Sequence, residues 1–257
     1  MSSPFDLTGR VAVVIGGTSG LGRAIAVGLA QHGADVVAGA RRREPVLETA
    51  AAIESLGRRT ARAQVDVSSR ESIDVLRDTV TSAFGRIDIL VNAAGITSKR
   101  PTLEVSETEW CSLIGTNLNG VLRACQSMYA PLKASGRGRI INIASLASFV
   151  AFHEVAAYAA SKSAVLSLTR SLACEWARDG IAVNAIAPGV FPTGMNSHLI
   201  EGTVRGREIL MRTPMGRFGR PEEVAGAAVL LASDAASFIA GQCIVVDGGF
   251  LASGANS

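Results

Sequence analysis

Tyr158 and Lys162 are the pair of side chains whose types and spacing most directly suggest chemistry. If the segment around them is a helix, positions i and i+4 place both on one face, one turn apart. A nearby ammonium stabilises a phenolate, and lowering a tyrosine pKa from about 10 to about 7 corresponds to roughly 4 kcal/mol. The pair could then exchange a proton with a substrate oxygen during hydride transfer at a carbonyl carbon. The alternative is a surface tyrosine that packs on a lysine stem.

A glycine-rich segment, GGTSGLG at residues 16–22, suggests a second kind of chemistry. It lies between an apolar run and an alanine-rich stretch of helical period. Glycines let the backbone approach a phosphate closely, and the N-terminus of the following helix offers free N–H groups to an anion. We expect a dinucleotide phosphate here; the alternative is a flexible strand-to-helix turn. The residues expected to hold the phosphates are Gly16, Thr18, Ser19, Gly20, Leu21 and Gly22.

These groups need a scaffold, and the chain alternates short apolar runs with stretches of helical period. Continuous apolar runs are typical of strands covered on both faces. The expected strands are Val11–Ile15, Val36–Ala40, Ile87–Val91, Ile140–Ile143, Ala182–Ala187 and Ile244–Val246, with a weaker seventh at Ala61–Val65. The expected helices are Leu21–His32, Val46–Leu56, Ser72–Phe84, Glu107–Ser135, Ala156–Arg178 and Pro221–Ser233. The alternation predicts an α/β fold, a doubly wound parallel sheet of about seven strands with helices on both faces.

Nothing in the sequence divides the chain, because it has no linker, tandem repeat or low-complexity tract. A single domain over residues 1–257 is therefore expected. The segment Phe191–Thr213 breaks the alternation of strands and helices, is rich in Pro and Gly, and follows a predicted strand. Because ligands bind beyond the carboxyl ends of the strands in open α/β sheets, we expect this irregular insert to act as a small lid.

Composition and charge exclude several classes of protein. Of 257 residues, 48% are hydrophobic and 18% are charged, which is typical of a globular protein. The net charge of +3 is spread along the chain and gives no surface for nucleic acid. Cysteines and histidines are too scattered for a metal site or a disulfide framework. No apolar stretch is long enough to span a bilayer and residues 1–6 lack a secretory signal, so we expect no membrane partner and a cytoplasmic location.

Four motifs together resemble the short-chain dehydrogenase/reductase family of oxidoreductases. They are the G-x-x-x-G-x-G spacing at 16–22, NAAG at 92–95, YAASK at 158–162 and the Pro-Gly pair at 188–189. The resemblance runs from about Leu7 to Gly249, nearly the whole chain, and implies a Rossmann-type domain. Ile15 departs from the family's threonine, which removes a side-chain hydrogen bond between the first and fourth strands. A homotetramer is implied as well, since the two longest predicted helices carry many small residues on faces that one domain would leave exposed.

The resemblance also implies catalytic roles. Ser145 would orient the substrate carbonyl, and Asn117 would join Lys162 through a water in a proton relay. The alternatives are a turn cap for Ser145 and a polar bond inside a helix for Asn117, whose segment also offers Asn119. The candidate catalytic residues are Asn117, Ser145, Tyr158 and Lys162.

Position 40, at the end of the second predicted strand, indicates the cofactor. Enzymes that prefer NAD carry an acidic residue there for the ribose 2′-OH, whereas this chain has Ala40 followed by three arginines. Arg41 and Arg42 could bind a 2′-phosphate, so NADP(H) is expected over NAD(H); a solvated helix start is the alternative. The remaining cofactor contacts implied by the resemblance come from Asp66, Val67, Asn92, Ala93, Gly95, Tyr158, Lys162, Pro188, Gly189, Val190 and Thr193. Asp66 could instead form a turn, and Asn92 is expected to serve the sheet more than the cofactor.

The sequence says less about the substrate. Lys99 and Arg100 follow a predicted strand and would favour an anion if they reach the cleft; a solvated charge pair is the alternative. His153 is expected to face the pocket, with a packed loop histidine as the alternative. The candidate substrate-binding residues are Arg100, Ser145, His153 and Tyr158.

The overall pattern resembles the sugar-acid branch of the family, the gluconate and deoxy-ketogluconate oxidoreductases. This implies hydride transfer between NADP(H) and a carbonyl or secondary alcohol of a sugar acid or keto acid, with Tyr158 as general acid and base. The alternative within the family is a 3-oxoacyl carrier-protein reductase, which is disfavoured because Gly136 and Asp179 stand at the positions of its basic docking residues. A non-catalytic dinucleotide sensor or scaffold is the alternative of another class. Retention of all four candidate catalytic residues argues against it.

Overall fold

The strands form one parallel sheet in the computed structural model, which describes residues 3–194 and 196–254. Over these residues the sheet has six strands in the order β2-β1-β3-β4-β5-β6. Every neighbouring pair is parallel, so the predicted doubly wound parallel sheet is confirmed. The strands are β1 (Val11–Ile15), β2 (Asp35–Gly39), β3 (Ile89–Asn92), β4 (Gly138–Ile143), β5 (Ile181–Pro188) and β6 (Cys243–Val246).

The seventh strand expected at Ala61–Val65 is wrong. This segment forms only an isolated bridge, between Ala40 and Gln64. The Val65 N–H donates to the Ala40 carbonyl, one residue beyond the end of β2. Because the contact falls past the end of the strand, no ladder follows from it.

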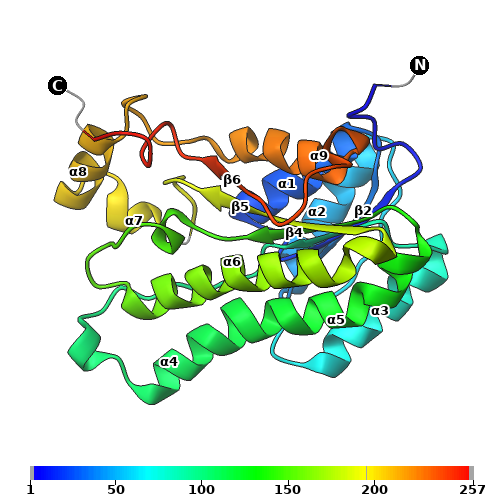
Figure 1. The fold of residues 1–257 in the computed structure, drawn as a ribbon, viewed down its shortest axis with the longest axis horizontal. Coiled ribbons are helices and arrows are strands. Elements are labelled where there is room, and N and C mark those ends of the chain that lie inside the picture. Colours follow the sequence, from blue (N-terminus) through cyan, green and yellow to red (C-terminus); the bar gives the residue numbers. More distant parts are fainter. Residues whose placement is uncertain (1–2, 195, 255–257) are drawn as a thin grey trace.

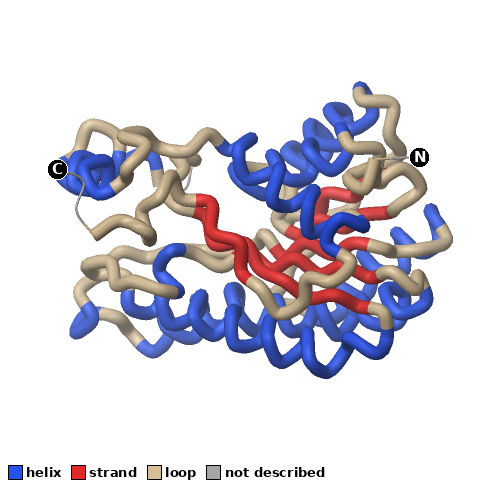
Figure 2. The backbone as a smooth tube through the Cα atoms, turned by 45° about the horizontal axis from the view of Figure 1, so that its top comes forward, coloured by secondary structure: helices blue, strands red, loops and turns tan. Residues whose placement is uncertain are grey.

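Helices cover both faces of the sheet, as predicted (Figures 1 and 2). Figure 1 shows α3, α5 and α6 on one face and α1, α2 and α9 on the other. No helix of the described residues has the length and apolar character that crossing a membrane requires. The helices are α1 (Gly20–Gln31), α2 (Arg43–Ser55), α3 (Arg70–Phe84), α4 (Glu107–Ile114), α5 (Gly120–Ala134), α6 (Ala156–Trp176), α7 (Ser197–Ile200), α8 (Val204–Arg212) and α9 (Ala225–Ala232).

Alternate residues of β1 show how the two helical layers share the sheet. Val13 and Ile15 belong to the apolar cluster that α3, α5 and α6 complete. Ala12 and Val14 point the other way, into the cluster completed by α1, α2 and α9. The strand is therefore buried on both faces, which explains why its sequence is continuously apolar.

The helix expected over Glu107–Ser135 is interrupted. Between α4 and α5 the residues Gly115–Asn119 form a π-helical turn, in which the Gly120 N–H donates to the Gly115 carbonyl. Glycines at both ends of the turn lower the local helix propensity, and the buried Asn117 side chain bonds outward to other elements. Periodicity alone could not show this insertion of one residue, which frequently marks a functional site.

The insert Phe191–Thr213 is more regular than expected, because it contains α7 and α8. The Thr203 side chain accepts a hydrogen bond from the Gly206 N–H at 3.0 Å and so caps the start of α8. Ile200 and Ile209 pack in a separate apolar cluster with Leu146 and Phe250. This insert lies at one end of the molecule, beside the C-terminal segment drawn in red in Figure 1.

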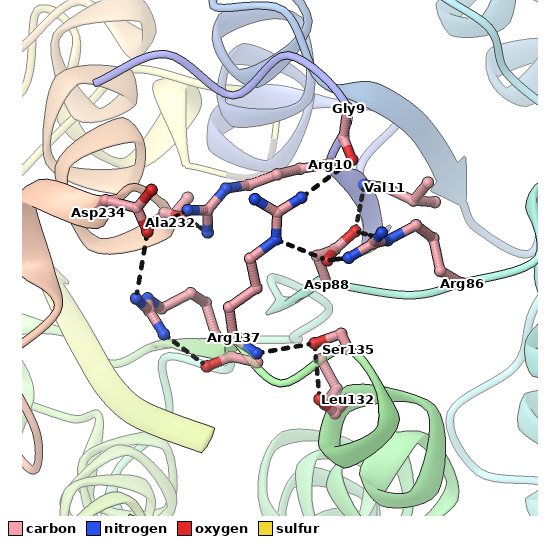
Figure 3. Close-up of polar contacts among 12 residues, drawn as sticks. Gly9, Arg10, Val11, Arg86, Asp88, Leu132, Ser135, Arg137, Ala232 and Asp234 are labelled. Atoms are coloured by element: carbon pink, nitrogen blue, oxygen red, sulfur yellow. Dashed lines mark hydrogen bonds and ion pairs between the residues drawn. The ribbon is translucent and has the colours of Figure 1, made fainter. Parts of the chain in front are cut away.

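Ion pairs join the amino ends of the strands, at the edge of the sheet opposite the carboxyl ends (Figure 3). Asp88 is fully buried and accepts hydrogen bonds from the Val11 N–H and from Nε of Arg86, both at 2.9 Å. Buried Arg10 pairs with Asp234. These contacts fix the amino ends of the strands and leave the carboxyl ends for ligands.

Candidate active site

Ser145, Tyr158 and Lys162 meet beyond the carboxyl end of β4. Tyr158 and Lys162 lie near the start of α6, with Nζ of Lys162 5.9 Å from the centre of the Tyr158 ring. A side-chain hydrogen bond joins Ser145 to the Tyr158 phenol. Three of the four predicted catalytic side chains are thus brought together where open α/β sheets bind their ligands.

Ser145 is both a turn cap and a partner of the phenol. Its backbone is extended, with φ −164° and ψ 162°, and it begins a short 3-10 turn, Leu146–Ser148. Its Oγ accepts a hydrogen bond from the Ala147 N–H at 3.1 Å. The hydroxyl proton is still free to point at Tyr158, so the structural and catalytic interpretations of Ser145 do not exclude each other.

The Lys162 ammonium is buried and held in place by the backbone. Its Nζ donates to the Ile143 carbonyl at 2.7 Å, at the last residue of β4. Burial lowers the pKa of Lys162 to about 8. No carboxylate of the described residues pairs with it. A methyl group added at Gly95 would lie 3.5 Å from Nζ, so the glycine leaves room beside the ammonium.

The pKa of the Tyr158 phenol is raised in this structure, and the lowered pKa expected with Lys162 and an oxidised nicotinamide beside the phenol stays a prediction. Burial raises its pKa, and the hydrogen bond with Ser145 acts against this effect without overcoming it. Desolvation of the phenolate therefore outweighs the hydrogen bond from Ser145. The phenol therefore keeps its proton, which is the form that the reduction of a carbonyl would start from.

Asn117 is fully buried, and its amide links three segments of the site. Its Oδ1 accepts from the Ile96 N–H at 2.9 Å, and its Nδ2 donates to the Ile96 carbonyl at 2.9 Å. Nδ2 also donates to Oγ of Ser161 on α6 at 3.0 Å. Asn119, by contrast, is exposed. The structure thus favours the first of the two asparagines, and it shows that both amide hydrogens of Asn117 are already used.

The glycine-rich segment is shaped by close backbone contacts. A methyl group at Gly16 would lie 2.4 Å from the Ala94 nitrogen, and one at Gly22 would lie 2.1 Å from the Gly16 carbonyl oxygen. Gly16 also has a positive φ of 82°. Ser19 precedes α1 without a side-chain capping bond, so the first N–H groups of the helix are left for an anion. This cradle fits the phosphates of a dinucleotide.

The segment after β5 reaches back over this loop. A methyl group at Gly20 would lie 3.2 Å from Cγ2 of Thr193. Oδ1 of Asn196 accepts from the Thr193 N–H at 2.9 Å, and Nδ2 of Asn196 donates to the Phe191 carbonyl at 3.1 Å. Thr193, one of the cofactor contacts implied by the family resemblance, therefore borders the predicted phosphate loop.

Arg41 and Arg42 are exposed at the start of α2. Neither guanidinium pairs with a carboxylate of the described residues. The pKa of Asp66 is lowered, mainly because its carboxylate accepts hydrogen bonds from Ser68. The positive charge of Arg41 lowers this pKa further, by a smaller amount. Oδ1 of Asp66 accepts from the Ser68 N–H at 2.9 Å and from its hydroxyl at 2.7 Å. The turn-forming role of Asp66 is therefore seen, while its contact with adenine stays a prediction.

Asn92 is bound into the sheet, as expected. Its Nδ2 donates to Oδ1 of Asn142 on β4 at 2.9 Å and lies 3.4 Å from Sγ of Cys125. Asn142 in turn donates to Oγ1 of Thr169 on α6 at 2.9 Å. This chain of buried bonds fixes β3, β4 and α6 relative to one another. Ala93 and Gly95, which follow Asn92, lie beside Gly22 and Lys162.

The predicted substrate residues Arg100 and His153 lie on loops, and Arg100 is paired with a carboxylate. Nε of Arg100 is 3.1 Å from a carboxylate oxygen of Glu109, and Nζ of Lys99 is 2.9 Å from Glu154. Both cations of this loop are therefore already paired. The His153 side chain is 85% exposed, which argues against the packed loop histidine, and its orientation toward the substrate stays a prediction. The His153 carbonyl accepts a hydrogen bond from Arg205 at 3.3 Å.

Sequence reasoning missed several residues that support the site. Ser161, Asn142 and Asn196 hold Asn117, Asn92 and Thr193 by hydrogen bonds that only the tertiary structure reveals. Ser161 lies inside the YAASK motif and was the most accessible signal. Among the described residues, no group of three His, Cys, Asp or Glu side chains could hold a metal ion.

Comparison with known proteins gives consistent matches over the whole length. A family model described as enoyl-(acyl carrier protein) reductase matches residues 15–251. The chain is 43% identical to the 2-dehydro-3-deoxy-D-gluconate 5-dehydrogenase of Escherichia coli over 251 residues, which cover 97% of this chain and 98% of that protein. It is 39% identical to the NAD-dependent glycerol dehydrogenase of Listeria innocua over 246 residues, 96% of this chain and 95% of that one.

The fold of this chain also matches a solved structure over nearly its whole length. The crystal structure of a gluconate 5-dehydrogenase from Burkholderia cenocepacia, in complex with NADP and tartrate, superimposes with a TM-score of 0.93 at 38% identity. The match covers 97% of this chain and 98% of that one.

Proposed function

The chain belongs to the short-chain dehydrogenase/reductase family of oxidoreductases, and from this premise we propose that it transfers a hydride between NADP(H) and a carbonyl or secondary alcohol of a sugar acid or related keto acid. One observation carries the proposal. Ser145, Tyr158 and buried Lys162 meet beside a glycine loop whose backbone contacts exclude any side chain at Gly16.

The protein's part in the reaction is to move and stabilise a proton. The cofactor, when bound, supplies or accepts the hydride. In reduction, the Tyr158 phenol donates its proton to the substrate oxygen, while the Ser145 hydroxyl hydrogen-bonds the same oxygen. The Lys162 ammonium, held by the Ile143 carbonyl, stabilises the phenolate that remains. Oxidation follows the same steps in reverse.

Asn117 has a positioning role in this proposal. Because both amide hydrogens bond to Ile96 and Ser161, a water-mediated link to Lys162 would have to use its backbone or the second lone pair of Oδ1. The amide meanwhile fixes the loop after β3 against α6.

Preference for NADP(H) is the finer part of the proposal. Ala40 offers no carboxylate to repel a 2′-phosphate, and the exposed guanidinium groups of Arg41 and Arg42, which pair with no carboxylate among the residues that the structure describes, follow it in the chain. NADP in the Burkholderia structure supports the same preference. The NAD-dependent Listeria relative shows why a direct measurement is needed.

The substrate class is supported by the sugar-acid names of the Escherichia and Burkholderia relatives. The loop cations Lys99 and Arg100 give weaker support than the sequence suggested, because Glu154 and Glu109 already neutralise them. A small molecule with one carboxylate fits this balance better than a highly charged one.

We also propose a homotetramer. Two separate exposed apolar surfaces support it: one contains Leu103 and Trp110 near α4, and the other contains Phe238 and Val245 at the β6 edge of the sheet. Two different self-complementary surfaces on one chain assemble four copies with closed symmetry.

Absorbance of the reduced nicotinamide tests the proposed reaction directly. Purified protein is assayed with NADP+ or NAD+ and with gluconate, 2-dehydro-3-deoxygluconate (in both directions) and the neutral polyol glycerol. Turnover of a sugar acid with NADP(H), at a kcat/KM at least tenfold above that for glycerol, is expected. Turnover of glycerol alone would contradict the substrate class, and no turnover with any of these compounds would contradict the proposal as a whole.

A further inference from the structure

Glu154 has an unusual backbone conformation for its residue type. Its φ is +65°, and among the described residues it is the one non-glycine residue with a positive φ. This left-handed region is disfavoured for a side chain that carries a Cβ, and glutamate is not among the residues that enter it readily. Such strain persists only where the surrounding structure imposes it, and it gathers at functional sites. Glu154 lies four residues before Tyr158.

The contacts of Glu154 show what imposes the strain. Its backbone carbonyl accepts from the Arg100 N–H at 2.7 Å. Its carboxylate lies 2.9 Å from Nζ of Lys99, and Lys99 lowers the pKa of Glu154. One residue therefore makes a backbone bond and an ion pair to two consecutive residues of another loop. We call these two contacts the Glu154 clasp.

The two loops joined by the clasp both begin at the active site. The first leaves β3, passes Gly95 beside Lys162, and is bound at Ile96 by Asn117. The second connects Ser145 to Tyr158. The first loop thus runs past Lys162, and the second carries Ser145 and Tyr158 at its two ends, so a contact between the loops acts next to the catalytic side chains.

Other charges near Glu154 do not replace Lys99. Nδ1 of His153 lies 3.6 Å from the Glu154 carboxylate, and the His153 side chain is largely exposed. Arg205 lowers the pKa of Glu154 only through a weaker electrostatic effect. Arg205 instead donates to the His153 carbonyl at 3.3 Å and so links α8 of the lid to the same loop.

We propose that Glu154 is a positioning and specificity residue that holds the loop 96–101 against the loop 149–155 and sets the width and charge of the substrate entrance. This inference rests on the proposed function for its substrate readout. It also predicts a change that needs no substrate. Without the clasp, the loop that carries Lys99 opens more often, and Lys99 regains an unpaired charge.

Trypsin gives the substrate-free test, because the Lys99–Arg100 bond is a cleavage site within the clasped loop. Glu154→Gln should be cut after Lys99 at least fivefold faster than wild type. Mass spectrometry of the fragment that ends at Lys99 measures the rate. The matched control is Glu175→Gln, which removes the same charge from the other end of α6, where the side chain is exposed. Equal cleavage of wild type, Glu154→Gln and Glu175→Gln would overturn the clasp.

A double-mutant cycle gives the second test, in steady-state assays with the best sugar acid found above. Glu154→Gln and Lys99→Met should each raise KM about fivefold while kcat and NADPH affinity stay within twofold, and the double variant should be no worse than the worse single one. If the KM increases of the two single variants multiply in the double variant, the two residues are not coupled. Glu154→Asp, which keeps the charge and enters positive φ more readily, should recover most of the loss.

The two tests separate the inference from the proposed function. Faster cleavage of Glu154→Gln without turnover of any sugar acid would keep the clasp and reject the substrate class. Sugar-acid turnover with unchanged cleavage and unchanged KM in Glu154→Gln would keep the substrate class and reject the clasp.

Discussion

The ammonium of Lys162 lies 5.9 Å from the centre of the Tyr158 ring, while its Nζ donates a hydrogen bond to the last carbonyl of β4. The strand therefore sets the position of the positive charge relative to the phenol. This arrangement underlies the first two predictions.

Tyr158→Phe should lower kcat by at least a thousandfold and leave the dissociation constant of NADPH within twofold. Only the oxygen that transfers the proton is removed, and the ring keeps its packing. Stopped-flow or steady-state rates together with fluorescence titration of NADPH provide the measurement. Substantial residual turnover would sink the assignment of Tyr158 as general acid. Lys162→Ala is the contrasting variant: it should lose activity and also weaken cofactor binding.

The unfolding free energy of the ligand-free protein should rise between pH 8 and pH 10.5 because of Lys162. Its pKa is about 8 in the folded protein against an ordinary value of 10.5, so in this window the folded state has lost a proton that the unfolded chain still holds. The gain amounts to about 3 kcal/mol, and below pH 8 the full penalty of a buried charge is present. Urea denaturation across this range measures it.

Lys162→Met should remove that pH dependence, whereas the exposed Lys133→Met should keep it, since Lys133 pairs with Asp179 and its pKa is raised rather than lowered. An identical pH dependence in wild type and Lys162→Met would count against burial as the cause.

Asn117→Ala should cost about 3 kcal/mol of unfolding free energy, because it removes the amide partner of both the N–H and the carbonyl of Ile96 and one of the hydrogen bonds of buried Ser161. Asn119→Ala is the matched control in the same turn, and it should change stability by less than about 0.5 kcal/mol because Asn119 is exposed. Chemical denaturation measures both. Equal losses would show that the turn itself, rather than the Asn117 amide, is what matters.

Arg41→Ala/Arg42→Ala should weaken NADPH binding at least tenfold and NADH binding little, since a charge-assisted hydrogen bond contributes about 1.5–3 kcal/mol. Arg43→Ala is the control for general electrostatic attraction. Parallel titrations with both cofactors measure the difference. If wild type already prefers NADH, or both cofactors weaken equally, the arginines do not read the 2′-phosphate.

Sedimentation equilibrium should give a mass four times that of the 26.6 kDa chain. Trp110→Asp and Phe238→Asp, placed on the two different apolar surfaces, should each reduce the assembly to dimers, because each would bury a charge in one interface. A wild-type mass of one chain would refute the tetramer.

Much of the fold was predictable because local patterns control it. Continuous apolar runs identified six strands, and the alternation with helices required a parallel sheet. The seventh strand failed because its apolar content says nothing about whether β2 extends far enough to pair with it: β2 ends at Gly39, before the bridge at Ala40.

The candidate site was predictable where one motif fixes spacing along a helix, as for Tyr158 and Lys162. It was not predictable where charges meet across the fold. Lys99 and Arg100 read as free cations in the sequence, and only the structure shows Glu154 and Glu109 against them. The same holds for His153, whose 85% exposure the sequence pattern does not show.

The π-helical turn at Gly115–Asn119 also separates two registers. Relative to an unbroken α-helix, one extra residue rotates everything beyond it by about 100°. The inward faces of α4 and α5 are therefore out of phase, and one continuous helical wheel drawn over both would assign the wrong residues to the core. A single-residue deletion within the turn would restore the phase, but it would also withdraw Asn117 from Ile96 and Ser161. The length of this segment is thus a constraint as strict as the identity of any side chain in it.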